Sequence, residues 1–236
     1  MTTVRVVGAR VDVPSDGAPD RRPRTILGPL DLTLTERRVT VVGANGSGKS
    51  TLLRLLNGLV APTSGHVTVD GLDTVRDGAA VRRRVAFAFT DPLSQLVLPT
   101  GREDVELSLR RVHRDRTARR AAARDVLDRF GLTALADQSV YDLSGGERQL
   151  LALAVVLATD PALLVLDEPS TLLDRRNTLR LRRVLEALPQ TVVLATHDLD
   201  LALVADRTLV VDGGAVVFDG DPADAVDHYR GLVDEP

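Results

Sequence analysis

A glycine-rich segment early in the chain holds the residue types that bind phosphate. The segment reads Gly43-Ala44-Asn45-Gly46-Ser47-Gly48-Lys49-Ser50-Thr51. Lys49 is the only lysine of the chain, beside twenty-nine arginines. Glycines let backbone N–H groups close around phosphate oxygens, and a planar guanidinium does not replace a compact ammonium in so tight a nest. We therefore predict that the segment binds a nucleoside triphosphate and that the Ser50 hydroxyl ligates Mg²⁺.

The flanking sequence predicts a strand before this segment and a helix after it. Val39, Val41 and Val42 form the apolar run that leads in, and residues 51–56 have the character of a helix. That order is the context of a P-loop, because the helix N-terminus directs its positive dipole end at the phosphates. A Gly-rich turn before a helix, without a ligand, is the alternative that the motif alone leaves open.

Two further apolar runs end in residues that can act on a phosphate. Residues 163–166 lead into Asp167 and Glu168, and residues 191–195 lead to His197. Ligands of open parallel sheets bind at the carboxyl ends of the strands. We expect Asp167 to hold Mg²⁺ through water, Glu168 to orient and polarise the attacking water, and His197 to contact the γ-phosphate. A purely structural role is the alternative for His197.

A fourth motif predicts a second helix end that suits a phosphate. It reads Leu143-Ser144-Gly145-Gly146-Glu147 and leads into an apolar helix. Ser144 is a suitable N-cap, and the two glycines expose backbone N–H groups beside the positive end of the helix dipole. A helix end can also bind anions without any function.

Strands and helices alternate along the chain, which predicts an α/β core. Residues 4–13 and 30–34 are predicted strands on either side of a polar loop at residues 14–23. The apolar runs that begin at Val39, Leu163 and Val192 suit central strands of a parallel sheet that is covered on both faces.

Residues 91–156 are predicted to form a helical insertion. The signals for helix are strongest over residues 105–112 and 114–130, and the second of these is rich in arginine and alanine. We expect its arginines to form a solvated helix face, with an RNA-contacting patch as the alternative.

The composition excludes several classes of protein. The 236 residues are 44% apolar, and a net charge of −3 provides no positive field for nucleic acid. The chain has no cysteine, so it contains neither a disulfide nor a thiolate metal site. The N-terminus lacks the apolar core of a signal peptide, and no apolar run approaches the ~18 residues of a membrane span. We expect a cytoplasmic chain that reaches a membrane only through a partner.

Taken in order, these motifs resemble the ATP-binding subunits of ABC transporters over nearly the whole chain. The motifs are the P-loop, Leu143-Ser144-Gly145-Gly146, Asp167-Glu168, Thr171-Leu172-Leu173-Asp174 and His197. The resemblance implies one ABC ATPase domain over residues 1–236, with a P-loop NTPase (RecA-like) α/β core, an N-terminal antiparallel β subdomain and an inserted α-helical subdomain. Residues 1–90 and 157–236 would form the core, and residues 91–156 the helical subdomain with the signature motif.

The same resemblance implies a head-to-tail dimer that binds ATP and Mg²⁺ at its seam. Ser144 and Gly146 of one protomer would close on the γ-phosphate held by the P-loop of the other, and Asp174 would line the seam. Opening and closing of the dimer would move the membrane subunits.

A shorter stretch resembles the energy-coupling-factor ATPases, which power uptake of vitamins and of cobalt or nickel ions. It includes Asp91-Pro92-Leu93-Ser94-Gln95, then Pro99-Thr100 and Glu103-Asp104-Val105. In that group Gln95 belongs to a short segment that faces the membrane-coupling subunit; a solvated polar residue is the alternative reading. Residues 172–177 and 103–110 look most like the biotin branch.

Two positions depart from the family pattern. Most members have glutamine where Thr90 stands, and that glutamine ligates Mg²⁺ and relays the state of the membrane subunits. Threonine offers a hydroxyl with a shorter reach. Most members also stack an aromatic residue on adenine, and Val13 occupies the matching position; Phe218 and Tyr229 are the remaining candidates for that stack.

We therefore predict an ATP-hydrolysing subunit that is peripheral to the cytoplasmic face of the membrane. Its expected partners are a transmembrane coupling subunit, a substrate-binding membrane subunit, and either a second copy or a related ABC ATPase; no nucleic acid is expected. One alternative is a soluble ABC ATPase that acts on ribosomes or DNA, although such proteins usually carry two cassettes or a long coiled-coil insertion. The other is a weakly hydrolysing regulatory module, which only the Thr90 departure supports.

The solitary lysine yields a first prediction. Lys49→Arg keeps the positive charge, but the guanidinium is larger and planar, so we expect an ATP analogue to bind at least about tenfold more weakly. Equilibrium titration measures this. Near-normal affinity of the variant for the analogue would show that the site requires only a positive charge at position 49 and not the geometry of a lysine side chain.

Overall fold

The computed structural model describes residues 1–14 and 23–234. The polar loop predicted at residues 14–23 therefore lies almost wholly outside the described residues. The strands are β1 Val4–Val13, β2 Arg24–Leu34, β3 Arg38–Val42, β4 Ser64–Val69, β5 Leu72–Asp73, β6 Val85–Ala88, β7 Leu163–Asp167, β8 Thr191–Ala195, β9 Arg207–Asp212 and β10 Ala215–Gly220. The α-helices are α1 Lys49–Leu56, α2 Gly78–Arg84, α3 Gly101–Ser108, α4 Arg116–Arg129, α5 Gly145–Leu157, α6 Arg175–Ala187, α7 Leu199–Ala202 and α8 Pro222–Asp234. Short 3₁₀ turns lie at η1 Pro92–Ser94, η2 Leu109–Arg111 and η3 Thr133–Leu135.

A six-stranded sheet forms the centre of the molecule, in the order β10-β9-β3-β8-β7-β6. The pairs from β9 to β6 are all parallel, and β10 joins antiparallel at one edge. The three apolar runs are its strands β3, β8 and β7, so the prediction of central parallel strands is confirmed. Along β7 the side chains alternate between two apolar clusters, since Leu163 and Val165 lie in one and Leu164 and Leu166 in the other. Burial on both faces explains why most residues of these strands are apolar.

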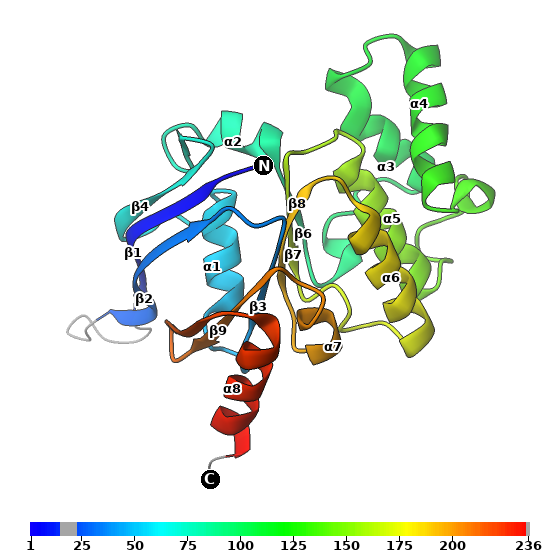
Figure 1. Ribbon diagram of the computed structural model, residues 1–236. Helices are drawn as coiled ribbons and strands as arrows, with labels where there is room; N and C mark the ends of the chain where they lie inside the picture. Colours follow the sequence, from blue (N-terminus) through cyan, green and yellow to red (C-terminus); the bar gives the residue numbers. More distant parts are fainter. Residues whose placement is uncertain (15–22, 235–236) are drawn as a thin grey trace.

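An antiparallel sheet of order β2-β1-β4-β5 covers α1 from the side away from the central sheet (Figure 1). One apolar cluster fills the space between the two sheets and includes Leu52, Leu53, Leu55 and Leu56 of α1. The N-terminal antiparallel subdomain that the sequence predicted is thus present.

Strand β2 begins at Arg24, earlier than the predicted strand at 30–34. Gly28 and Pro29 lie inside this strand, where the chain stays extended. The Gly28 N–H donates to the carbonyl of Gly214 at 2.7 Å, and Leu27 is fully buried. A tertiary contact supplies the hydrogen bond that a turn would otherwise have satisfied.

Helices α3, α4 and α5 form a lobe beside the sheets (Figure 1). The predicted helix at 105–112 begins earlier, at Gly101, because the Thr100 side chain caps it by accepting from the Glu103 N–H, and it ends in the 3₁₀ turn η2. The lobe has its own apolar cluster, to which α5 contributes Leu150 and Leu151. Leu153 and Leu157 of α5 instead pack in the cluster against the central sheet. Helix α5 therefore packs against both the helical lobe and the central sheet.

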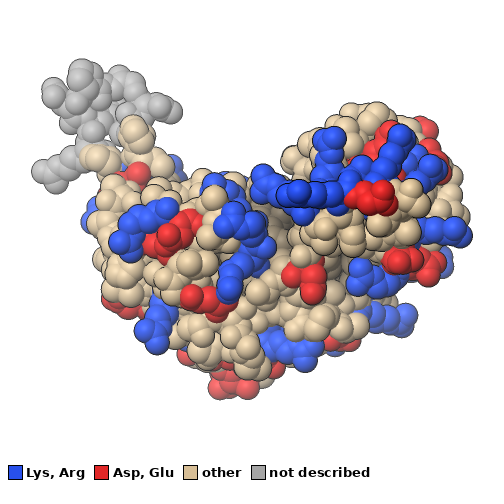
Figure 2. Space-filling model, turned by 90° about the horizontal axis from the view of Figure 1, so that it is seen from above, with Lys and Arg blue, Asp and Glu red and all other residues tan. Residues whose placement is uncertain are grey.

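The arginines of α4 lie mostly on its outer face. Arg116, Arg120 and Arg124 are exposed and four residues apart, while Ala123, Val126 and Leu127 are buried against the lobe. Figure 2 shows basic side chains gathered on this lobe, to the right of the view. The expected solvated face is confirmed. Within residues 1–14 and 23–234, no helix combines the length and apolar character that crossing a bilayer demands.

Candidate active site

The predicted chemical residues meet at the carboxyl edge of the central sheet. Strand β8 lies between β3 and β7, and all three run parallel. The P-loop follows β3, Asp167 and Glu168 close β7, and His197 follows β8. Parallel pairing brings these strand ends together, although β3 is more than a hundred residues from β7 and β8 in sequence.

The P-loop backbone adopts positive φ angles that glycine accommodates more easily than any other residue. Gly43 has φ 153°, and a Cβ there would lie 2.1 Å from the carbonyl oxygen of Val211. Gly48 has φ 112° immediately before α1. These two glycines allow the loop to wrap tightly against β2 and β9 and then open α1 with its N–H groups free of side chains.

Lys49 is the buried cation of the loop. Its side chain is 5% exposed, and its ammonium donates to the carbonyls of Gly43 at 2.8 Å and Ala44 at 3.0 Å. The same ammonium lies 3.5 Å from Oε1 of Glu168. The lysine therefore links the P-loop to the end of β7 at the point where a phosphate would enter.

Asp167 is the buried anion at the end of β7. The Ser50 hydroxyl donates to its Oδ1 at 2.8 Å, and the Arg54 guanidinium lies 3.6 Å from its Oδ2. Burial raises the pKa of the Asp167 carboxyl, and the hydrogen bond from Ser50 and the charge of Arg54 oppose that rise only in part. The two proposed Mg²⁺ ligands, Ser50 and Asp167, thus stand in direct contact.

Glu168 adopts a left-handed backbone conformation, with φ 52°, directly after the strand. Such a conformation costs energy for a residue with a side chain, and it is held here because the Glu168 N–H donates to the carbonyl of Ala195 at 3.0 Å. The turn directs the carboxylate toward His197. Oε2 lies 2.6 Å from the His197 Nδ1 and accepts from the His197 backbone N–H at 3.2 Å. Lys49, Glu168 and His197 therefore form a continuous polar row.

Polar atoms at this site that have no hydrogen-bond partner could bind a polyphosphate and its metal ion. Ser47 Oγ and Glu168 Oε1 are buried and have no hydrogen-bond partner among the described residues. Mg²⁺ in nucleotide sites is commonly held by one or two carboxylates together with substrate phosphates. Ser50 and Asp167 can supply the protein oxygens, and the P-loop N–H groups with Lys49 can bind the phosphates.

Thr90 lies beside this site but its hydroxyl is directed at the backbone. It donates to the carbonyl of Asp167 at 2.8 Å, two residues after the end of β6. The hydroxyl oxygen retains acceptor capacity, so Thr90 stays a candidate metal ligand. The hydrogen bond that it makes stabilises the turn of the chain at Asp167.

The Gln95 amide makes two hydrogen bonds within its own chain, and the prediction that its segment faces a membrane partner stays a prediction. Its Oε1 accepts from the Phe89 N–H at 3.1 Å, and its Nε2 donates to the carbonyl of Ala152 at 2.7 Å. Phe89 follows β6 and Ala152 lies in α5. Gln95 therefore connects the central sheet to the helical lobe, and any effect it has on a membrane partner would act through that connection.

The signature segment begins α5 as predicted. Ser144 and Glu147 form a reciprocal capping box, in which the Ser144 side chain accepts from the Glu147 N–H and the Glu147 carboxylate accepts from the Ser144 N–H. Among the described residues, Ser144, Gly145 and Gly146 make no hydrogen bond with the P-loop. A Cβ at Gly146 would lie 2.3 Å from the Asn177 side chain, so this end of α5 packs on α6 of its own chain.

Asp174 and Val13 are both exposed. Asp174 caps α6 by accepting from the Asn177 N–H at 2.8 Å. Val13 ends β1 with 38% of its side chain exposed. Phe218 and Tyr229, the alternative partners for adenine, pack in the cluster beneath α8, and the Phe218 ring lies 5.2 Å from that of His228.

Arg54 was not predicted from the sequence. It stands four residues after Ser50 in α1, which places both side chains on one helix face, and this spacing is the signal that could have identified it. Its guanidinium partly balances the charge of Asp167.

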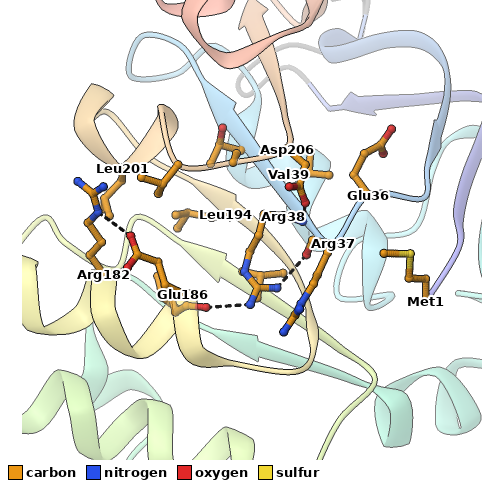
Figure 3. A pocket seen from close by; sticks show the side chains of 15 residues that line it. Met1, Glu36, Arg37, Arg38, Val39, Arg182, Glu186, Leu194, Leu201 and Asp206 are labelled. Carbon is orange, nitrogen blue, oxygen red and sulfur yellow. Dashed lines mark hydrogen bonds and ion pairs between the residues drawn. The ribbon is translucent and has the colours of Figure 1, made fainter.

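A separate pocket of about 500 Å³ opens at the other end of β3 (Figure 3). Two of its basic side chains already have partners, since Arg182 lies 2.8 Å from Glu186 and Arg38 donates to the carbonyl of Gln190 at 2.7 Å. Its lining residues are Met1, Glu36, Arg37, Arg38, Val39, Thr40, Arg182, Leu185, Glu186, Val192, Leu194, Leu201, Val204, Ala205 and Asp206. None of the predicted site residues lines it, so the chemistry belongs to the carboxyl edge of the sheet.

The buried Asp167 yields a prediction on stability. Because its folded pKa is raised, its favourable contribution is present at low pH and is lost as pH rises through that pKa. Asp167→Asn should therefore leave the thermal midpoint of the nucleotide-free protein at pH 7 unchanged or higher, while Mg²⁺-dependent ATP hydrolysis is lost.

Asp73→Asn is the matched control, because hydrogen bonds from the backbone of Arg76 and Val75 lower the pKa of Asp73. That carboxylate stabilises the fold above its unfolded pKa, and the contribution disappears as pH falls, so the control should lower the midpoint at pH 7. Calorimetry at pH 5 and pH 7 measures both. A clear drop in the midpoint of Asp167→Asn at pH 7 would contradict the assigned cost of burial.

Comparison with known proteins agrees with this geometry. The sequence pattern of the family described as "ABC transporter" matches residues 27–171. The biotin transport ATP-binding protein BioM of Rhizobium etli is 42% identical over 88% of this chain and 92% of its own length. The energy-coupling factor transporter ATP-binding protein EcfA1 of Latilactobacillus sakei is 37% identical over 83% of this chain and 72% of its own length.

Among solved structures, the chain is similar to the ATP-binding cassette MJ0796, a dimer in a post-hydrolysis state bound to ADP and phosphate. The TM-score is 0.82 and the identity 27%, over 93% of this chain and 98% of that one. The P-loop NTPase fold and the ATPase activity predicted from the motifs are confirmed. This chain belongs to the ABC transporter family, in which it is an ATP-binding subunit of the energy-coupling-factor type.

Proposed function

We propose that this ATPase energises an energy-coupling-factor importer of a vitamin, with biotin favoured over cobalt or nickel ions. The similarity to BioM and EcfA1 supports the transporter type, and 42% identity to BioM supports biotin in particular. The chain would work at the cytoplasmic face of the membrane, held by a transmembrane coupling subunit and a substrate-binding subunit. Residues 91–156 would form the lobe that faces these partners.

One observation carries the catalytic part of the proposal. The Glu168 carboxylate is held at a strand end between the Lys49 ammonium, at 3.5 Å, and the His197 imidazole, at 2.6 Å. In the proposed step a water oxygen bonds to the γ-phosphorus and the bond from that phosphorus to the β–γ bridging oxygen breaks. The water proton moves toward Glu168, while Lys49 and the P-loop N–H groups stabilise the charge on the phosphate oxygens.

Metal binding is assigned to Ser50 and Asp167, with Thr90 as a further candidate. When bound, Mg²⁺ neutralises charge on the transferred phosphoryl group. The contact from Ser50 to Asp167 at 2.8 Å aligns two ligand oxygens in advance. His197 would orient Glu168 and contact the γ-phosphate.

The working unit is proposed to be a head-to-tail dimer of this chain with a second copy or a related ATPase. Ser144 and Gly146 make no hydrogen bond with the P-loop of their own chain in the described residues, so a phosphate contact from α5 needs a second protomer. The dimeric MJ0796 cassette supports this arrangement. Asp174, exposed beside the start of α5 and α6, would line the seam.

The role of Glu168 is tested by Glu168→Gln, which keeps size and removes the proton acceptor. Hydrolysis should fall about 100-fold or more, with ATP affinity retained, and an ATP-bound dimer should accumulate. Phosphate release and size-exclusion chromatography with ATP measure both effects. Steady-state hydrolysis within about twofold of the wild type would show that another group activates the water.

The coupling role of Gln95 is tested by Gln95→Ala. Both amide contacts join the chain after β6 to α5 and involve none of the proposed catalytic or phosphate-binding residues, so basal hydrolysis of the isolated subunit should stay within about twofold. In the assembled transporter, stimulation of hydrolysis and vitamin uptake should be lost, because movement at the lobe no longer reaches the sheet. Ser94→Ala, one residue away with its hydroxyl on Asp91, is the matched control. Normal uptake with Gln95→Ala would defeat the coupling role.

A further inference from the structure

We propose that Tyr141 forms the base-binding surface of the nucleotide site in trans, stacking on the adenine held by the partner protomer. This inference rests on the proposed head-to-tail dimer. It would supply the aromatic face that Val13 does not provide in the P-loop's own chain.

The other aromatic side chains are already in use. All six lie within the described residues, as Phe87, Phe89, Phe130, Tyr141, Phe218 and Tyr229. The Phe87 and Phe89 rings pack at 4.9 Å, Phe130 joins the helical lobe, and Phe218 and Tyr229 pack against the apolar cluster between α8 and β9. Tyr141 alone is exposed, with 74% of its surface open to solvent.

The backbone under Tyr141 is held firmly, so the exposed ring does not belong to a loose loop. Val140 and Leu143, on either side, are 2% and 3% exposed and anchor the turn in the helical lobe. The Val140 N–H donates to the carbonyl of Pro99 at 2.9 Å. An exposed aromatic ring between two buried anchors is pre-organised for contact with a ligand or a partner.

Hydrogen bonds close this turn and tie it to α5. The Asp142 N–H donates to the carbonyl of Ser139 at 3.0 Å, and the Tyr141 N–H donates to the Ser139 hydroxyl at 3.3 Å. Arg148, in the first turns of α5, donates to the carbonyl of Leu143 at 2.9 Å. The position of Tyr141 is therefore coupled to the start of the signature helix.

The ring is also within reach of the base. Tyr141 stands three residues before the Ser144 cap, and that length of chain spans at most about 10 Å. If the start of α5 meets the γ-phosphate of the partner's nucleotide, the ring can approach the other end of the same molecule. Leu172 is 61% exposed, and its carbonyl lies 3.5 Å from the Cβ position of Gly145, so a second exposed apolar side chain flanks this helix start. The pair suits a surface that a second copy covers.

A base contact made in trans has a functional consequence. A single protomer would bind the triphosphate mainly through its P-loop, and the base would be sensed only when the dimer closes. Stacking on an aromatic ring tolerates different bases because each has a π-face. We therefore expect closure to need an aromatic base but to discriminate weakly between ATP and GTP.

The test uses the full chain carrying Glu168→Gln, in which the closed dimer accumulates. Tyr141→Ala should raise the ATP concentration for half-maximal dimerisation about fivefold or more, and Tyr141→Phe should restore it. ATP affinity of the monomer should be the same in all three proteins. The thermal midpoint of each variant shows that the fold is intact.

A fluorescent probe separates stacking from general packing. With 2-aminopurine riboside triphosphate, closure should quench the fluorescence in the wild-type and Tyr141→Phe proteins but not in Tyr141→Ala. Leu172→Ala, the matched control, should weaken closure while leaving the quench of the closed dimer intact.

Two outcomes would overturn the proposal while the dimer itself stands. In one, Tyr141→Ala dimerises with ATP as readily as the parent; in the other, it closes less readily but with an unchanged quench. Failure of the Glu168→Gln parent to dimerise with ATP would instead overturn the head-to-tail arrangement, and the trans contact with it.

Discussion

A single, partly buried hydrogen bond joins the two elements on which the site depends. The Ser50 hydroxyl donates to Asp167 at 2.8 Å, which connects the first turn of α1 to the end of β7. Because β8 separates β3 from β7 in the sheet, this contact spans the strand that carries His197. The P-loop, the acidic pair and the histidine are positioned relative to one another through that contact and through the sheet beneath it.

Burying charged side chains at this edge of the sheet costs free energy, and hydrogen bonds and ion pairs offset that cost to different extents for each of them. Asp167 is 2% exposed and its pKa is raised, so the folded chain would be more stable with the group protonated. Lys49 is satisfied by backbone carbonyls of its own loop and by Glu168. Glu168 sits in a left-handed conformation, and its Oε1 has the Lys49 ammonium at 3.5 Å but accepts no hydrogen bond among the described residues. Strain and incomplete pairing of this kind are typical of sites whose missing partner is a substrate.

Helix α5 connects the two main parts of the molecule, the helical lobe and the central sheet. One face of it, with Leu150, Leu151, Ala154 and Val155, packs in the helical lobe, while Leu153 and Leu157 pack against the central sheet. Gln95 adds a polar link from the end of β6 to the middle of the same helix. A movement at the nucleotide edge of the sheet and a movement at the lobe therefore reach each other through one rigid helix.

The sequence by itself determined the chemistry and most of the order of elements. The P-loop, the acidic pair and the Ser144 cap were each readable because local rules govern them: glycine conformations, strand ends and helix capping. The central strands were readable because burial on both faces leaves an unbroken apolar run. Only the tertiary contact explains why β2 continues through Gly28, since the Gly28 N–H donates to the carbonyl of Gly214, nearly two hundred residues away along the chain.

Tertiary structure also decided the direction of Gln95 and the contact of Arg54 with Asp167. Side-chain direction depends on which elements pack together, and no local pattern encodes that packing. The sequence could show that Tyr141 is one of few aromatic residues, but only the fold showed it exposed on a fixed turn. The type of a residue determines which chemical roles it can take. Its contacts depend on how elements far apart along the chain pack together.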